Sequence, residues 1–403
     1  MMQSTTMGTE RSEVAKTRRR LARVGLNAAS IERFLGQVLE VDWHVATLRS
    51  VSLGTLGVLH AVSLCIHVIG RAAAWARDKD PKHAVKQIDR LLSNENVTLS
   101  SFARAWVRFV VGPRPEVVVA LDWTEFDSDG HSTIAAYLIT NHGRATPLLW
   151  KTVEKADLEG KRNAHEDRIL EQLSDCIPAG VRVTVLADRG FGDQKRYEQL
   201  AGLKMDFVIR FREVITVTTQ FGDSRSAGEW LPKSGRATML KDVAVTQDFY
   251  VLPAVVVVHD TKMKESWCLA TSRADLGAAE VVRLYSKRFT IEETFRDQKD
   301  IHFGMGLKAT HIKSAERRDR LLLLAALAHA LLTLLGAAGE RCGLDRKLRT
   351  NTSNKRQMSL YNQGFYWYMA IPNMREERLS LLMNAYVEVL REHDFLRDIF
   401  GVI

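Results

Sequence analysis

The strongest constraint on how this chain folds is a run of 19 residues, 321–339, that contains no charged side chain. A helix of this length could cross a lipid bilayer. The run also contains His329, Thr333 and several small residues, and a helix that is apolar on all sides is equally typical of the buried centre of a large protein. Residues 51–70 are apolar too, but they include two histidines. We therefore predict a buried core helix at 321–339 and no association with a membrane.

The chain has more basic than acidic side chains, which distinguishes its composition from that of an average globular protein. The 403 residues include 57 lysines and arginines against 48 acids, which gives a net charge of +9. Such a surplus favours polyanionic partners such as nucleic acid. It is concentrated in the segments 16–23, 308–320 and 341–355. For the first segment, a solvated helix face and an arm that contacts phosphates are both open interpretations.

Cysteine usage and the amino-terminal sequence indicate a reducing compartment. The four cysteines include no Cys-x-x-Cys pair, which excludes a zinc ribbon and a dense disulfide framework. The amino terminus has basic side chains but no apolar core, so it does not resemble a secretory signal. We therefore expect a cytoplasmic protein, and the chain length predicts two or three domains.

The periodicity of apolar residues divides the chain into three parts. Residues 1–112 are predicted to be helical, and residues 341–403 are predicted to be helical again. Residues 113–340 alternate between strand-like and helical patterns. The predicted strands are 116–121, 132–140, 146–153, 181–187 and 206–212, and the predicted helices are 166–177, 194–204 and 278–300.

Strand-like patterns also fill residues 213–275, between the fifth strand and the helix 278–300. Apolar and β-branched residues gather at 215–221, 249–260 and 266–272, which predicts a β-rich insertion. Taken together, the patterns predict an α/β fold. Its mixed sheet is covered by helices, carries the β-rich insertion, and is flanked by helical amino- and carboxyl-terminal regions.

Two acidic residues stand where predicted buried strands end. Asp122 directly follows the strand 116–121, and Asp188 directly follows the strand 181–187. Open α/β sheets bind their ligands at the carboxyl ends of strands. Each aspartate alone could equally be a strand-end cap, but charges at the ends of buried strands seldom lack a purpose. The neighbouring acids fall in a polar turn, where we expect them to be solvated: Glu125, Asp127 and Asp129.

A third acid lies on the predicted helix 278–300. At about 100° per residue, Tyr285, Arg288, Glu292 and Lys299 fall within a stripe about 60° wide. An acid between two cations and a phenol is expected where a carboxylate holds a metal while its neighbours bind phosphates. A surface pair between Arg288 and Glu292, four residues apart, explains the same spacing without a ligand.

These four residues resemble the Tyr-Arg-Glu-Lys signature of bacterial insertion-sequence transposases of the DDE type. Two, three and six residues separate the members of that signature, and the spacing here fits without a gap. The sequences LDWTEFD, around Asp122, and LADRGFGD, around Asp188, are similar to the first and second aspartate motifs of the same group. The resemblance covers about residues 115–300 well and the flanking helical regions loosely.

The resemblance implies a ribonuclease-H-like catalytic core over residues 113–340, with the insertion at 213–275. In such a core, Asp122, Asp188 and Glu292 would be the catalytic residues and would bind two Mg²⁺ ions, for which Mn²⁺ can substitute. Carboxylates are suitable hard ligands, and two ions can activate the nucleophile and stabilise the leaving oxygen. The implied activity is cleavage at transposon ends followed by transfer of the 3′-hydroxyl into target DNA.

The resemblance also implies residues that contact DNA. Tyr285, Arg288 and Lys299 would contact phosphates near the cut, and Trp267 would stack on a flipped base in relatives that form a hairpin at the transposon end. Trp267 is equally compatible with an aromatic core position. The sequence departs from those relatives at Phe289, where they carry tryptophan, which puts the hairpin route in doubt. Arg210, on the strand 206–212, is a further candidate for a DNA contact.

The partners implied by the resemblance are DNA and a second copy of the chain. The helical region 1–112 would bind the terminal inverted repeats, and the region 341–403 is a candidate surface for a homodimer. The protein would act in the bacterial cytoplasm, associated with the nucleoid when bound to DNA. Two alternatives remain: a DNA-binding protein that has lost catalysis, and a nuclease that cuts DNA without strand transfer.

Overall fold

A computed structural model describes residues 16, 20, 27–38, 43–246, 248–302, 304–353 and 355–392. Most of the basic segment 16–23 therefore lies outside the described residues. Of its cations, Arg20 donates hydrogen bonds to the carbonyl oxygens of Ile371 and Pro372, at 3.0 and 2.7 Å. This side chain thus binds the carboxyl-terminal part of the chain itself.

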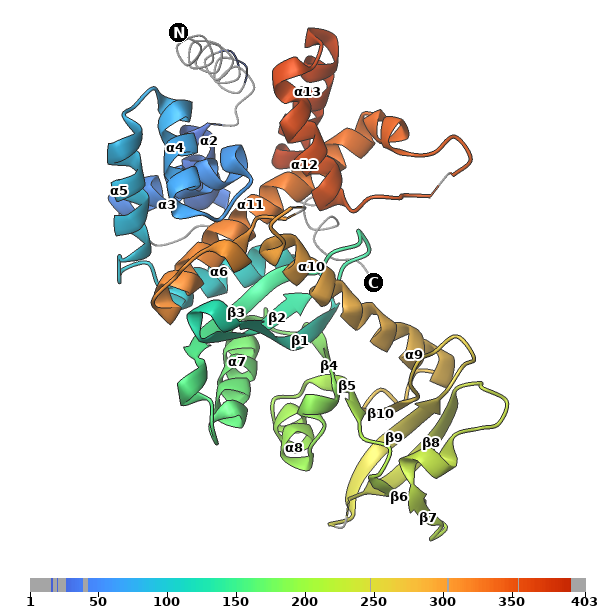
Figure 1. Cartoon of the computed structure of the whole chain (residues 1–403). Helices are drawn as coiled ribbons and strands as arrows, with labels where there is room; N and C mark the ends of the chain where they lie inside the picture. Colours follow the sequence, from blue (N-terminus) through green and yellow to red (C-terminus); the bar gives the residue numbers. More distant parts are fainter. Residues whose placement is uncertain are drawn as a thin grey trace.

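The region before residue 113 is helical, as predicted. It contains α2 (Ala28–Arg33), α3 (Val45–Ala61), α4 (Ile66–Arg77), α5 (Pro81–Leu92) and α6 (Leu99–Val111). The apolar stretch 51–70 does not form one long helix, because α3 and α4 meet at an angle of 99°. Gly70 on α4 lies against the backbone of Val85 on α5, where any side chain would collide. Figure 1 shows these helices gathered at one side of the molecule.

A ten-stranded sheet forms the centre of the chain, in the order β3-β2-β1-β4-β5-β10-β9-β8-β6-β7. β1 pairs in parallel with β4, and β4 pairs in parallel with β5, whereas the other neighbouring pairs are antiparallel. The strands are β1 (Glu116–Phe126), β2 (His131–Leu138), β3 (Thr146–Glu154), β4 (Arg182–Ala187), β5 (Asp206–Phe211), β6 (Thr216–Thr218), β7 (Ser224–Ser226), β8 (Thr238–Val245), β9 (Tyr250–Val258) and β10 (Trp267–Thr271). The predicted mixed α/β sheet is confirmed.

Three strand predictions need correction. β1 extends five residues beyond the predicted end at 121, because its far half pairs with β2 in a hairpin. Of the predicted strand 215–221, only Thr216–Thr218 form a strand, β6. The strands β7 and β8 were not predicted. The half-exposed pattern of β8 gives little apolar signal. The strands of the segment 213–275 continue the central sheet, since β10 pairs with β5.

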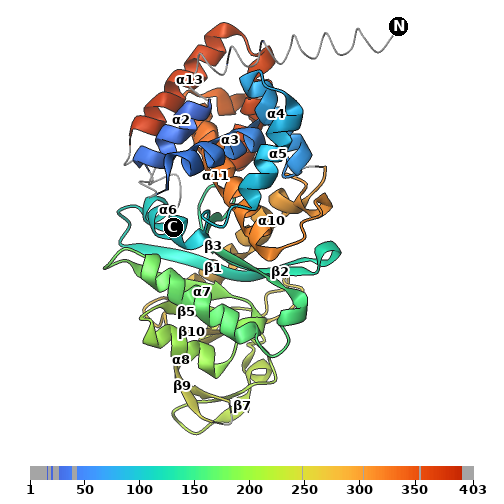
Figure 2. The ribbon, with the colours of Figure 1, turned by 90° about the vertical axis from the view of Figure 1, so that its left-hand side faces the viewer.

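Helices cover both faces of the sheet. α7 (Arg162–Cys176) and α8 (Gln194–Gly202) follow β3 and β4 in the chain. Figure 2 shows α7 on one side of β1, β2 and β3, with α10 and α11 on the other side.

The predicted helix 278–300 is interrupted. It consists of α9 (Ala278–Ser286), a 3-10 turn (Lys287–Phe289) and α10 (Thr290–Lys299). Side-chain hydroxyls bond backbone carbonyls on either side of the break: Ser286 donates to Arg283 and Thr290 donates to Lys287. Such bonds compete with regular helical hydrogen bonding. The four residues predicted to share one stripe therefore do not lie on one straight helix.

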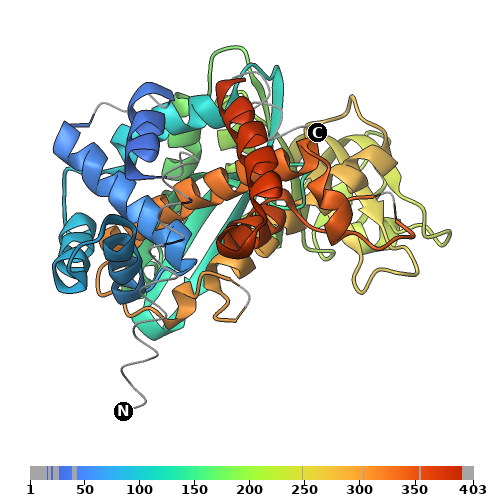
Figure 3. The same cartoon turned by 90° about the horizontal axis from the view of Figure 1, so that it is seen from above.

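The run 321–339 lies inside α11 (Ala315–Arg341), and all of its residues are buried. α11 is long and apolar enough to span a membrane, yet its apolar window is entirely buried in the protein. It packs against α3, β3, α12 (Leu360–Ala370) and α13 (Glu376–Arg391). Figure 3 shows α11 passing between the amino-terminal helices and α12 and α13. The predicted buried core helix is confirmed, and α12 and α13 agree with the prediction that residues 341–403 are helical.

The crossing of α11 and α12 should be intolerant of any added side chain. A methyl group at Gly336 would collide with the carbonyl oxygen of Leu360, which is backbone and cannot rotate away. We expect Gly336→Ala to reduce the free energy of unfolding by about 1–3 kcal/mol, the usual cost of overpacking. Gly202→Ala on α8 is the control, since no atom lies within 4 Å of the added group. Equal thermal midpoints for the two variants would contradict this account of the crossing.

Candidate active site

The parallel pairing of β1 with β4 brings two of the predicted catalytic residues together. The pairing ends where Leu121 lies opposite Ala187, and Asp122 and Asp188 are the next residues on their strands. Asp122 does not end its strand as predicted, because β1 continues beside β2 to Phe126. Asp188 does follow the end of β4, and its carboxylate accepts a hydrogen bond of 2.8 Å from the backbone N–H of Gly190.

Helix α10 places Glu292 beside Asp122, through Arg288. The Arg288 guanidinium donates to Oδ2 of Asp122 at 3.0 Å and to Oε1 of Glu292 at 2.7 Å. Arg288 is 6% exposed, whereas the side chain of Glu292 is 47% exposed. The predicted ion pair between Arg288 and Glu292 is thus present, and Arg288 also forms an ion pair with Asp122.

Contacts with the loop between β2 and β3 fix the position of α10. The Thr294 hydroxyl accepts a hydrogen bond of 3.0 Å from the backbone N–H of Ala145. One turn further, Asp297 forms a buried ion pair with Arg144. These bonds hold the helix that carries Glu292 against the same strands that carry Asp122.

The pKa of the Asp122 carboxyl group is raised to about 6, chiefly because the group is buried. The nearby carboxylates of Asp188 and Glu292 contribute to this increase in the pKa. The Arg288 guanidinium and the backbone N–H of Trp123 oppose this shift. Burial of the Asp122 carboxyl group therefore outweighs the effect of Arg288, which lowers its pKa.

Three aromatic residues surround the Arg288 end of the site. The ring of Trp267, on β10, lies 5.0 Å from that of Tyr285 and 6.1 Å from that of Phe289. The Arg288 guanidinium lies 4.9 Å from the Phe289 ring. Tyr285 is buried, and burial raises the pKa of its phenol to about 12. Trp267 is only partly buried, so it is not a simple core residue.

Arg210 lies on β5 beside a pocket with a volume of about 450 Å³. Its guanidinium donates to Glu265 at 2.7 Å and to the carbonyl oxygen of Ser266 at 2.9 Å. The pocket is also lined by Arg189, the residue that follows Asp188, and by Arg212. Arg210 is therefore near the second aspartate, but its guanidinium is already engaged by an acid.

Lys299 lies away from the carboxylates. Its ammonium group is 4.9 Å from the ring of Phe126, at the far end of β1. Four residues of strand separate Phe126 from Asp122, a distance of about 13 Å. Burial lowers the pKa of the Lys299 ammonium group. Lys299 lies seven residues after Glu292 on α10, about two helical turns along the same helix. The break at Lys287–Phe289 instead separates Tyr285, on α9, from Glu292 and Lys299.

The donor chemistry of the site fits a divalent cation, although its side chains have not converged on one point. Carboxylate oxygens from Asp122, Asp188 and Glu292 are the hard ligands that Mg²⁺ prefers. Among the residues that the structure describes, no group of three or more acidic, histidine or cysteine side chains is arranged to hold a metal ion. Arg288 occupies the space between Asp122 and Glu292, which keeps their carboxylates apart.

Sequence reasoning missed two buried acids near the site. Asp129 was expected to be solvated, but its side chain is 5% exposed and pairs with the buried Arg318. Glu166, on α7, is 2% exposed. The sequence held a signal for the second, since Glu166 falls on the same helical face as the buried Ile169, Leu170 and Leu173.

The mixed sheet flanked by helices, with Asp122 and Asp188 at neighbouring strands and Glu292 on a packed helix, is consistent with a ribonuclease-H-like fold. A family model described as the transposase DDE domain matches residues 113–331, which is more than half of the chain. The chain belongs to this family of DNA-acting transposases. A comparison with curated proteins finds no significant match.

Replacing Arg288 should increase the response of the protein to Mg²⁺. Removing one partner from a buried cluster of charges is costly, so we expect Arg288→Met to lower the thermal midpoint by about 5 °C. Saturating Mg²⁺ should restore more stability to this variant than it adds to the wild type, because the cation no longer competes with the guanidinium. Arg296→Met is the control, since among the residues that the structure describes Arg296 forms its ion pair with Glu293 on the same helix. An equal effect of Mg²⁺ on all three proteins would contradict this prediction.

Proposed function

We propose that this transposase cuts DNA at the ends of its transposon and joins the freed 3′-hydroxyl to target DNA. The observation that carries the proposal is that Asp122, on β1, and Asp188, directly after β4, follow the last pair of one parallel ladder, while the buried Arg288 joins Asp122 to Glu292 on α10. A divalent cation would stabilise these neighbouring carboxylates by reducing their mutual repulsion.

The three acids would be the metal ligands, with Mg²⁺ as the physiological ion and Mn²⁺ as a substitute. Two bound cations would supply activation of the attacking oxygen and stabilisation of the leaving oxygen. Asp122 lies within the central strand β1 and Asp188 directly follows β4, whereas the more exposed Glu292 is accessible to DNA. Arg288 can donate to a phosphate through the same guanidinium that now binds the two carboxylates.

The aromatic cluster beside Arg288 supports a role in DNA contact. Trp267 and the 43% exposed Phe289 present ring surface on which an unpaired base could stack. We propose Tyr285 and Arg288 as contacts to the DNA backbone near the cut, with Arg210 beside them on β5. Lys299 would contact a phosphate further along the DNA. This arrangement is compatible with the Tyr-Arg-Glu-Lys subgroup and with a cut-and-paste route that includes a hairpin.

The amino-terminal helices would recognise the terminal inverted repeats. The outer face of α5 carries Lys82, Lys86 and Arg90, all exposed, and within the described part of the chain none of them forms an ion pair. Unpaired cations on one helix face suit a DNA backbone. We assign residues 1–112 to DNA-end binding, 113–340 to catalysis and 341–403 to a homodimer surface. The protein would act in the cytoplasm and, when bound to DNA, at the nucleoid.

Replacing any one of the three acids should abolish cleavage. With Mg²⁺ and a duplex that carries an end of the element, we expect Asp122→Ala, Asp188→Ala and Glu292→Ala to cut at least about 100-fold more slowly than the wild type, because each removes a metal ligand. Binding of the same duplex should remain, as measured by electrophoretic mobility shift. Full activity in any of the three variants would refute the assignment. Cleavage by the wild type without joined products would instead identify a nuclease that lacks strand transfer.

The basic face of α5 should determine affinity for DNA but not the chemical step. We expect the double variant Lys82→Ala/Lys86→Ala to bind end duplexes more weakly, with a slope of log affinity against log salt that is shallower by about 2. Its cleavage rate at saturating DNA should remain that of the wild type. The control is Lys161→Ala, an exposed lysine beside α7. An unchanged salt slope in the double variant would show that α5 does not contact phosphates.

A further inference from the structure

We propose that Glu166, on α7, is a positioning residue that fixes both aspartate-bearing segments of the active site. This inference rests on the proposed role of Asp122 and Asp188 as metal ligands. Glu166 touches neither aspartate. Its two carboxylate oxygens instead bind one residue next to each of the two segments, Trp123 on β1 and Arg196 on α8.

The first contact fixes the strand that carries Asp122. The indole N–H of Trp123 donates to Oε1 of Glu166 at 2.8 Å. Successive side chains of a strand point to opposite faces of the sheet, so Trp123 reaches α7 while Asp122 reaches Arg288 and α10. The Arg162 guanidinium lies 4.8 Å from the Trp123 ring. Because Glu166 and Arg162 of α7 hold Trp123 on the opposite face of the sheet, the backbone of β1 cannot rotate to turn the Asp122 carboxylate away from the site.

The second contact fixes the segment that follows Asp188. Arg196 donates to Oε2 of Glu166 at 2.8 Å and to Asp167 at 2.6 Å. Its own backbone N–H is capped by Asp193, five residues after Asp188. Between them, Gly192 lies so close to the carbonyl oxygen of Arg210 that no side chain would fit. The turn after Asp188 is therefore held by α8 at one end and by β5 in the middle.

The burial of this pair indicates a positional role beyond simple stability. The side chains of Arg196 and Glu166 are only 2% and 3% exposed. A buried ion pair contributes little net stability compared with apolar residues of similar volume, but its fixed geometry can select one arrangement. Glu166 also occupies a helix face that is otherwise apolar. The Glu166 carboxylate thus links Trp123 on β1 to Arg196 on α8. The distance between the proposed metal ligands Asp122 and Asp188 depends on this link.

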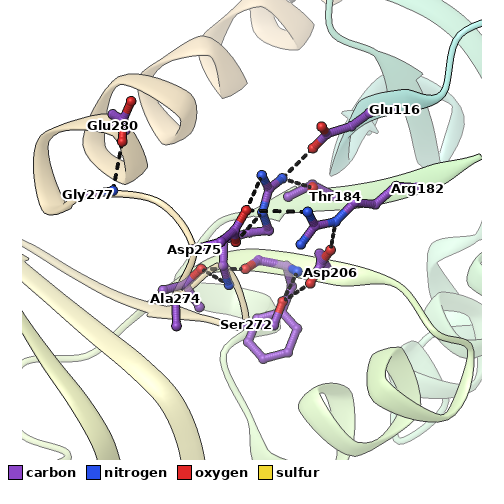
Figure 4. Close-up of polar contacts among 12 residues, drawn as sticks. Glu116, Arg182, Thr184, Asp206, Ser272, Ala274, Asp275, Gly277 and Glu280 are labelled. Atoms are coloured by element: carbon purple, nitrogen blue, oxygen red, sulfur yellow. Dashed lines mark hydrogen bonds and ion pairs between the residues drawn. The ribbon is translucent and has the colours of Figure 1, made fainter.

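A second ion pair at the opposite end of the same strands provides a control, with a buried arginine and an acid, Glu116, that is 39% exposed. Arg273 follows β10 and bonds Glu116, the first residue of β1, as well as Thr184 and Asp275. Figure 4 shows this cluster joining the starts of β1 and β4 to the loop before α9. Glu116→Gln removes the same charge as Glu166→Gln from a buried arginine, but at the other end of β1 from Asp122.

The experiment measures Mn²⁺ binding to the full-length protein without DNA, by electron paramagnetic resonance or calorimetry. Asp122→Ala identifies the binding that belongs to the site. We expect Glu166→Gln and Trp123→Phe each to weaken that binding about 10-fold, as is common when the support of a metal ligand is removed. Glu116→Gln should retain wild-type Mn²⁺ affinity even where its thermal midpoint is lower. Affinity for end duplexes should remain unchanged in all three.

Mn²⁺ affinities within twofold of the wild type in both Glu166→Gln and Trp123→Phe would overturn the proposal, as would an equal loss in Glu116→Gln. If Glu166→Gln does not fold, Trp123→Phe decides alone, since it keeps the ion pair between Glu166 and Arg196 and loses the hydrogen bond from Trp123 to Glu166. A wild type that binds Mn²⁺ at Asp122 but cuts no DNA would refute the proposed function and leave this test valid. Equal Mn²⁺ binding by the wild type and Asp122→Ala would overturn both.

Discussion

The parallel pairing between β1 and β4 is the interaction on which the site depends. Six residues of each strand pair in register, from Glu116 with Arg182 to Leu121 with Ala187. Every residue of β1 from Val117 to Leu121 is buried, so packing on both faces of the sheet holds this part of the strand. The residues that follow the last pair are both aspartates. Their proximity is thus a consequence of apolar packing several residues away.

The position of Glu292, the third acid, depends on a different constraint, which is the break between α9 and α10. In a continuous helix, the regular rotation of about 100° per residue would alone set the directions of the Arg288 and Glu292 side chains. The 3-10 turn at Lys287–Phe289 instead brings Arg288 inward, where it is nearly fully buried and reaches Asp122. Opposing partners make that burial tolerable, since an unpaired guanidinium would be costly in the same place. The arginine and the acids therefore stabilise each other's position in the absence of other cations.

Much of the fold could be predicted from the sequence because its apolar patterns are local and strong. The runs that became β1, β4 and β5, and the uncharged run within α11, each bury nearly every residue. β7 and β8 could not be predicted, because short or half-exposed strands have little periodicity. The proximity of Asp122 and Asp188 could be predicted, because each directly follows a predicted buried strand. The sequence did not show that the Lys299 ammonium group would lie beside Phe126, at the far end of β1, because that contact depends on how α10 packs on the sheet. Nor did it show the break between α9 and α10, where hydroxyl-to-backbone bonds of Ser286 and Thr290 flank the 3-10 turn.

The basic surplus of the chain takes on a different meaning once its arginines are located. Several of the most deeply buried cations are used inside the protein: Arg196, Arg273, Arg288 and Arg318 each bind acids or backbone. They contribute to the net charge of +9 but cannot all face a DNA backbone in this arrangement. The cations of α5 are exposed and, among the described residues, unpaired by any acid. Local exposure, rather than net charge, is therefore what distinguishes a surface that can bind DNA from a framework that positions carboxylates.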